Sequence, residues 1–348
     1  MSQRHPDRKH HLLGHHPGHH HQTRHHLGRR EVFGLAAATA AGVALGAAGL
    51  ERSMTTATAA SRPRVLFGAW VPGSTAAWDE VEHKLDRRLD IEHWYQGWGV
   101  EENGFDLDRA RAVRARGGIP MVTWEPWDYR RGRNQPAYRL KRIVAGRFDA
   151  YIRANARQMA AVNGPVWLRF AHEMNGRAYP WSIGVNGNSG RDYIRAWRRI
   201  VRIFRAQGAT NVRFIWCPLV PGPGTSPIKR SFPGDKHIHY VGMDGYNAGR
   251  EADWGGWLSF DEVFRPLYRQ LRRMSRRKVI IAETGCAERG GNKATWISSA
   301  FGRRLAKHYP AVRAVVWFNE PREADWRMES SSASLTAARR AFSSGPFA

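Results

Sequence analysis

Short apolar runs alternate with amphipathic helical patterns from Val65 onward, and this alternation restricts the possible folds more than any other feature of the chain. Eight runs have the length and composition of buried strands: residues 65–71, 91–98, 119–124, 166–171, 212–217, 240–246, 279–282 and 312–318. Helical patterns lie near residues 76–88, 106–116, 147–162, 190–206, 259–275, 292–308 and 333–342. The stretch after the fifth strand is proline-rich and predicts a loop. Strands that alternate with helices in this way run parallel to one another, so we expect an α/β protein.

Eight strand–helix units between residues 65 and 342 suit a (β/α)8 TIM barrel. A doubly wound open sheet is the alternative, but no glycine-rich phosphate loop follows an early strand of the sequence. The sequence also contains no internal repeat and no linker to a second domain after residue 60. We therefore predict a single barrel domain over residues 60–348, with its functional groups at the carboxyl ends of the strands.

Residues 1–59 have a different composition, and we expect a leader rather than part of the barrel. Ten histidines fall within the first 27 residues without any periodicity, which predicts a disordered extension. Arg29 and Arg30 then precede an Ala/Gly-rich stretch over residues 35–50, an arrangement that resembles a twin-arginine export signal. Ala57-Thr58-Ala59 fits a cleavage site. These features predict a secreted protein; a membrane anchor is less favoured because the stretch is poor in Leu, Ile and Phe.

The net charge is +25, and most of the excess lies outside the leader. It is compatible with association with an anionic cell wall or an acidic polysaccharide. The basic residues fall mainly on predicted helices, as at residues 195–199 and 272–273, so we interpret them as solvated helix faces. Because no basic run is interleaved with aromatic residues, we predict no nucleic-acid partner. Cys217 and Cys286 could form one bridge, but two free buried thiols are the favoured interpretation.

Polar and aromatic residues gather where six of the predicted strands end: at residues 94–98, 124–127, 172–175, 244–247, 283 and 317–320. On a barrel these segments converge on one mouth. The chain contains 15 tryptophans, more than a core usually needs. We expect about half of them to be core residues, and the others to line a groove in which flat ligands such as sugar rings stack.

Two glutamates occupy equivalent places at this predicted mouth. Glu173 follows the apolar run at 166–170, and Glu283 follows the run at 279–282. Two carboxylates at the ends of two parallel strands can form an acid–nucleophile pair that cleaves a glycosidic bond. Glu125, Asp244 and Glu320 also lie at strand ends and compete for these roles.

The chain resembles glycoside hydrolase family 26, a family of retaining (β/α)8 barrels. The resemblance covers about residues 64–342 and is carried by the stretches at 94–96, 123–127, 169–176, 179–181, 241–247, 281–284, 317–319 and 325–327. It implies that Glu173 acts as general acid and then as general base. It also implies that Glu283 is the nucleophile, held by a phenolic hydrogen bond from Tyr246. Trp317 would form the floor beneath the sugar at the cleavage point.

The expected substrate-binding set is completed by residues near the same strand ends: His172, Trp98, Trp124, Glu125 and Trp181. We expect His172 to orient groups at the site and Glu125 to bind sugar hydroxyls. Arg169 lies at mid-strand, and its sequence position leaves open whether it belongs to the site or is a buried structural arginine.

The resemblance implies a retaining endo-β-glycosidase that acts on a polysaccharide by a mechanism that needs no cofactor or metal. With the export leader we expect a secreted protein, and we expect a monomer. An endo-β-1,4-mannanase is favoured, and a mixed-linkage β-glucanase and a β-1,3-xylanase are the alternatives within the family. A non-catalytic sugar-binding barrel is the alternative of another class. One position departs from the pattern: mannanases of the family usually carry an aromatic residue two positions after the glycine of His-Glu-Met-Asn-Gly, where this chain has Ala178. This departure weakens the case for mannan itself.

Overall fold

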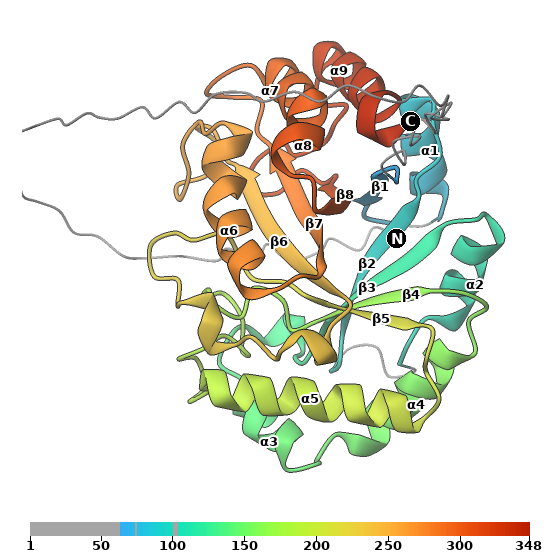
Figure 1. Cartoon of the computed structure of the whole chain (residues 1–348), viewed down its shortest axis with the longest axis vertical. Helices are drawn as coiled ribbons and strands as arrows, with labels where there is room; N and C mark the ends of the chain where they lie inside the picture. The colour runs from blue at the N-terminus through green and yellow to red at the C-terminus, as the bar shows by residue number, and fades with distance from the viewer. Residues whose placement is uncertain (1–62, 74, 100–103) are drawn as a thin grey trace, which may run out of the picture. The chain divides into compact units, whose positions relative to one another are not determined.

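Eight parallel strands close on themselves in chain order in the computed structural model, which describes residues 63–73, 75–99 and 104–348 (Figure 1). The strands are β1 (Leu66–Trp70), β2 (Ile91–Gly97), β3 (Ile119–Glu125), β4 (Val166–Phe170), β5 (Val212–Trp216), β6 (Tyr240–Asn247), β7 (Lys278–Cys286) and β8 (Val312–Phe318). Because β1 pairs with β8, the sheet has no free edge. The predicted TIM-barrel fold class is confirmed. The predicted leader, with its paired arginines and cleavage site, lies outside the described residues.

Helices follow most strands, as the sequence pattern predicts. They are α1 (Thr75–Leu85), α2 (Leu107–Ala115), α3 (Leu140–Val144), α4 (Asp149–Ala160), α5 (Gly190–Ala206), α6 (Phe260–Met274), α7 (Lys293–Phe301), α8 (Arg303–His308) and α9 (Ser332–Phe342). Two details differ from the prediction: α3 was not expected, and the pattern near 292–308 forms two helices that meet at Gly302. Between β5 and β6 the structure has only the short 3-10 turns Ile228–Arg230 and Asp235–His237, as the prolines indicate.

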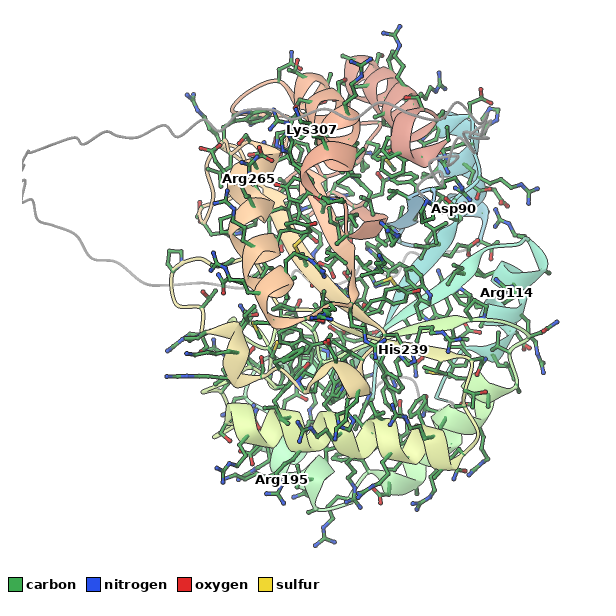
Figure 2. All side chains as sticks on the ribbon, in the orientation of Figure 1. Asp90, Arg114, Arg195, His239, Arg265 and Lys307 are labelled. Atoms are coloured by element: carbon green, nitrogen blue, oxygen red, sulfur yellow. The ribbon has the colours of Figure 1, made fainter. Side chains whose placement is uncertain are left out.

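Local sequence explains why the longest helices begin where they do. Ser189 and Asp192 form a capping box at the start of α5, and Ser259 and Glu262 form another at the start of α6. Along α5 one face is buried against the barrel, while Arg195 points away from it (Figure 2). Arg195 and Arg198 are exposed, as the interpretation of a solvated face requires, whereas Arg199 pairs with Asp149. Among the residues that the structure describes, no helix has the length and apolar character needed to cross a membrane.

Side chains alternate between two separate cores along each strand. A small apolar cluster fills the barrel interior: Ile91, Met121, Trp167, Ile215, Cys217, Ile280, Ala282, Ala314 and Val316. A much larger cluster lies between the barrel and its helices. On β3, Met121 and Thr123 point inward, whereas Val122 and Trp124 point toward the helices. Whether a residue occupies an inward-facing or an outward-facing position of its strand therefore decides whether its side chain can reach the site.

Three tryptophans that were predicted to contact the substrate face the helices instead of the barrel mouth. Trp124 is fully buried and stacks on Tyr151 of α4, with ring centroids 5.8 Å apart. Trp98 packs on Trp124 in the same outer core, at 4.6 Å between centroids. The prediction was wrong because a place at a strand end does not specify the face, and these residues lie on the helix-facing side.

Trp317, the predicted floor of the site, also faces outward. It is fully buried and packs against Phe301 of α7 and Phe342 of α9. Its indole N–H donates a 2.7 Å hydrogen bond to the carbonyl of Trp326. The next residue, Phe318, belongs instead to an aromatic cluster with Tyr95 and Tyr246. Trp317 therefore lies in the outer core, which contradicts its predicted role as a sugar platform.

Tryptophan serves the core more than expected. Twelve of the 15 tryptophans are buried rather than about half, and Trp254 is the exposed one. Both cysteines are free and buried, as predicted. Cys217 donates its S–H to Asp244 at 3.1 Å, and Cys286 accepts a hydrogen bond from the Asn247 amide at 3.2 Å.

Trp124→Ala tests the corrected role of this residue. Removing a fully buried indole leaves a cavity between β3 and the helices, so we expect the free energy of unfolding to fall by about 3–5 kcal/mol. Urea denaturation measures this loss. The KM of the folded variant for a glycan should stay unchanged; a marked rise in KM under conditions where the variant is folded would restore Trp124 to the binding site.

Candidate active site

The carboxylate of Glu283 on β7 lies at the centre of the barrel mouth and accepts hydrogen bonds from three strands. Its Oε1 accepts from the Tyr95 hydroxyl of β2 at 2.5 Å and from the Arg169 guanidinium of β4. Its Oε2 accepts from the Tyr246 hydroxyl of β6 at 2.6 Å. The contact with Tyr246 is the one that the resemblance implies. Four strands thus position one carboxylate.

These donors determine the protonation state of Glu283. Burial by itself would raise its pKa, but the Arg169 charge and the two phenolic hydrogen bonds outweigh burial and hold the pKa of Glu283 below its ordinary value. Glu283 is therefore ionised at neutral pH, the state that a nucleophile requires.

Arg169 is shared between two buried carboxylates. It donates to both oxygens of Asp244, at 2.8 and 2.7 Å, and its Nε donates to Thr123 at 2.7 Å. The side chains of Arg169 and Asp244 are fully buried. This answers the question that the sequence left open, because Arg169 is both a buried structural residue and a direct partner of Glu283.

The same guanidinium bears on metal binding. Ligand atoms of His172, Asp244 and Glu283 lie within 4.8 Å of one another, a spacing that could suit a metal ion. Arg169 already binds both of these carboxylates and neutralises much of their charge. A cation would have to displace it, so this cluster is better described as a buried ion-pair network.

Glu173 lies just after β4 in a turn with unusual backbone geometry. Glu173 has φ of 50° and Ala171 has φ of 45°, a left-handed conformation that is rare for residues other than glycine. The Glu173 N–H donates to the Cys217 carbonyl at 2.8 Å, which fixes the turn against the end of β5. The turn places the Glu173 and Glu283 carboxyl groups in one electrostatic environment.

Burial, together with the nearby charges of Asp244 and Glu283, raises the pKa of Glu173 well above its ordinary value. The pKa values of Glu173 and Glu283 are thus shifted in opposite directions at one mouth. Two carboxyl groups with opposite shifts are what an acid–nucleophile pair requires.

His172 links the site to a second group of side chains. It is buried, and burial lowers its pKa well below the ordinary value, so it is neutral. Its Nε2 lies 3.1 Å from the Tyr179 hydroxyl and 3.9 Å from Glu283 Oε1, and its Nδ1 lies 3.9 Å from Glu125 Oε1. Glu125 points inward and accepts a 3.0 Å hydrogen bond from the Trp127 indole. The structure therefore brings His172 and Glu125 to the site, as predicted.

Trp181 lies behind this group rather than in the groove. It is fully buried, stacks in parallel on Tyr179 at 4.5 Å between centroids, and donates to the His172 carbonyl at 2.6 Å. The predicted substrate contact is wrong for Trp181, because Tyr179 covers it. Trp181 instead supports the residues that face the mouth.

Sequence reasoning gave no role to Tyr95, although it lies within a stretch that carries the family resemblance, and considered Tyr179 only as a possible substitute for the aromatic ring absent at Ala178. Strict alternation along β2, where Ile91 and His93 point inward, would have found Tyr95. It would also have selected Phe318 over Trp317. Trp70 of β1 completes the aromatic wall: it packs edge-on against Tyr95 and donates to Glu320 at 2.9 Å.

A family comparison agrees with this geometry. The model of glycosyl hydrolase family 26 matches residues 117–302. The chain belongs to this family. The match covers the segment from β3 to the end of α7 and includes both Glu173 and Glu283. The resemblance inferred from the sequence is confirmed.

Curated relatives in the family carry different names. The chain is 42% identical over 289 residues to Endoglucanase H of Acetivibrio thermocellus, across 80% of this chain and 30% of that protein. It is 28% identical over 121 residues to Beta-1,3-xylanase TXYA of a Vibrio species, across 33% of this chain and 24% of that protein. The chain thus spans less than a third of the length of either relative.

Solved structures support the fold. The Bacillus subtilis mannanase man26 superposes with a TM-score of 0.58 at 16% identity, over 81% of this chain and 86% of that one. A Cellulomonas fimi endo-beta-1,4-mannanase double mutant superposes with a TM-score of 0.61 at 19% identity, over 82% and 71%. Both share the barrel architecture with this chain.

Tyr95→Phe and Tyr246→Phe test the electrostatics of Glu283. Each variant removes a donor that favours the ionised carboxylate, so the pKa of Glu283 should rise. The acidic limb of the pH profile of kcat/KM should therefore move to higher pH in both variants. A hydrogen bond to a charged group contributes about 1.5–3 kcal/mol, so kcat/KM should fall on the order of tenfold or more.

Tyr240→Phe is the matched control, because Tyr240 lies on β6 at the opposite end from Tyr246. It should leave the profile in place. An acidic limb that does not move in either test variant would contradict the assignment of Glu283 as the ionised group.

Proposed function

We propose that this protein hydrolyses internal β-linkages of a polysaccharide with retention of configuration, using Glu173 and Glu283. The observation that carries the proposal is geometric: one barrel mouth holds Glu173 beside Glu283, which Arg169, Tyr95 and Tyr246 bind, and the pKa values of the two carboxyl groups are shifted in opposite directions. In the first step the Glu283 carboxylate attacks the anomeric carbon while Glu173 gives its proton to the departing glycosidic oxygen. In the second step Glu173 takes a proton from water, the water oxygen bonds to the anomeric carbon, and Glu283 is released.

The pKa coupling between the two residues supports this order of events. The charge of Glu283 is one cause of the raised pKa of Glu173. Once Glu283 forms an ester with the sugar, that charge is gone, and the pKa of Glu173 falls. The residue that began as an acid then becomes a base suited to activating water.

The buried network supports the same chemistry. When Glu283 becomes an ester, Arg169 keeps Asp244 as its counter-ion and is not left as an unpaired buried charge. The hydroxyls of Tyr95 and Tyr246 remain in place to receive the carboxylate when it re-forms.

For the substrate, we propose a β-glucan with 1,4 linkages as the first candidate and β-1,4-mannan as the second. The 42% identity to a protein named endoglucanase supports the first, although that name describes a protein more than three times as long as the matched region. Mannan, which the sequence resemblance favours, is supported by structures at 16–19% identity. Ala178, exposed beside the acid, lacks the aromatic ring typical of the family's mannanases.

Glu283→Ala tests the nucleophile. Because a covalent step is removed, kcat should fall on the order of 10³-fold or more while glycan binding persists. Azide can occupy the vacated space, restore turnover and give a glycosyl azide of inverted configuration, which NMR identifies. Glu173→Ala is the matched comparison: it should retain activity on aryl glycosides with good leaving groups. Wild-type kinetics for Glu283→Ala would reject the assignment.

A substrate panel tests the proposed function as a whole. The full-length protein is incubated with lichenan, mannan, glucomannan, laminarin and xylan, and NMR follows the first anomer released. We expect the β-anomer first, with the highest kcat/KM on the mixed-linkage glucan. Release of the α-anomer first would indicate inversion. Binding to a glycan without hydrolysis of any would instead favour the sugar-binding barrel.

A further inference from the structure

Trp254 is exposed in a protein that otherwise uses tryptophan almost entirely in its core. Its exposed fraction is 51%, and among the described residues only Leu258 is another large apolar side chain with comparable exposure. It lies in the loop after β6, at the carboxyl end of the strands, the end that also carries Glu283. An indole kept in water at the mouth of a glycosidase barrel offers a surface for a ligand.

Trp254 is not a loosely held side chain. Its ring stacks on Trp326 at 6.2 Å between centroids with an interplanar angle of 28°, and Trp326 packs on Tyr246 at 4.9 Å. Tyr246 in turn donates to Glu283. A continuous series of ring contacts therefore runs from the outer surface to the reacting carboxylate.

The loops that carry Trp254 and Trp326 also line a hollow of about 540 Å³. Its walls come from three loops, those after β6, β7 and β8, and contain residues 250–251, 288–289 and 321–325. Exposed side chains in these walls include Arg250, Arg289 and Glu323. Guanidinium and carboxylate groups of both signs offer donors and acceptors to sugar hydroxyls without selecting a strongly charged ligand.

The walls of the hollow are tied together. Glu251 accepts one hydrogen bond from the Arg289 N–H at 2.7 Å and another from the Asp325 N–H at 2.8 Å, which joins the three loops. Gly249 has φ of 56° and approaches the Arg289 carbonyl so closely that a Cβ would lie 1.9 Å from it. The hollow is thus a preformed feature of the mouth, and binding there requires little reordering.

We propose that Trp254, supported by Trp326, and the adjoining hollow form an outer subsite that binds a β-glucosyl unit of the substrate away from the cleaved bond. A ring with all its substituents equatorial presents an apolar C–H face to the indole on either side, whereas the axial O2 of mannose obstructs one face. The hydroxyls at the ring edge then reach the polar groups of the hollow. This inference rests on the proposed glycosidase function and adds a preference for longer gluco-configured chains.

Binding of a chain-length series to full-length Glu283→Gln tests the subsite without turnover. Cello-oligosaccharides from two to six units are titrated by calorimetry. We expect the affinity of Glu283→Gln to rise with chain length. In the double variant Glu283→Gln/Trp254→Ala, the affinity for the longer chains should be lower on the order of tenfold. Trp254→Phe should restore part of it. Manno-oligosaccharides of the same lengths should show a smaller gain in the parent.

Leu258→Ala is the matched control, since it removes the other exposed apolar side chain of the same loop and should keep the full gain. Thermal unfolding confirms that all variants are folded. The subsite is overturned if affinity still rises fully with chain length in the Trp254→Ala variant, or if Leu258→Ala loses as much of that rise as Trp254→Ala. Either result leaves the glycosidase proposal intact. Failure of wild-type protein to hydrolyse any glycan, with no binding by Glu283→Gln, overturns both.

Discussion

The guanidinium of Arg169, buried at the barrel centre between Asp244 and Glu283, is the interaction on which the rest of the site depends. A buried positive charge is unfavourable unless it is paired, and Asp244 accepts two hydrogen bonds from this guanidinium. The Nη2 group of Arg169 then donates to Glu283. Because Glu283 is kept ionised, its charge in turn helps to keep Glu173 protonated. One ion-pair network thus contributes to both pKa shifts.

Closing the barrel is what makes this network possible. Arg169, Asp244 and Glu283 come from β4, β6 and β7, and they meet only because the sheet closes and directs alternate side chains inward. Below them the interior is filled by apolar side chains that exclude water, which strengthens every charge–charge interaction above. Around them the rings of Tyr95, Tyr246 and Phe318 form a wall, and loops of three strands extend it outward toward Trp254.

The predicted site residues agree or disagree with the structure according to the face of the strand on which each one lies. The structure places Glu125, Tyr246 and Glu283 at the barrel mouth, where their motifs predict them. Trp98, Trp124 and Trp317 were misplaced, although all three lie at the strand ends where functional residues gather. Each lies one residue from an inward position, and a register shift between β7 and β8 just before Thr284 and Trp317 adds to the difficulty on β8. A prediction that is wrong by one position along a strand therefore assigns to the site a side chain that lies in the outer core.

By itself, the sequence determined the order of the eight strands and of most helices, the barrel, the family and the places of the two glutamates at strand ends. These follow from apolar periodicity, capping residues and short motifs, all of which act over a few neighbouring positions. Only the tertiary structure decided that Arg169 joins Asp244 to Glu283, that Tyr95 supplies a second phenol, and that Trp254 stays exposed above Trp326. Those contacts join residues far apart in the chain, and burial, pKa and stacking depend on three-dimensional neighbours that no local pattern encodes.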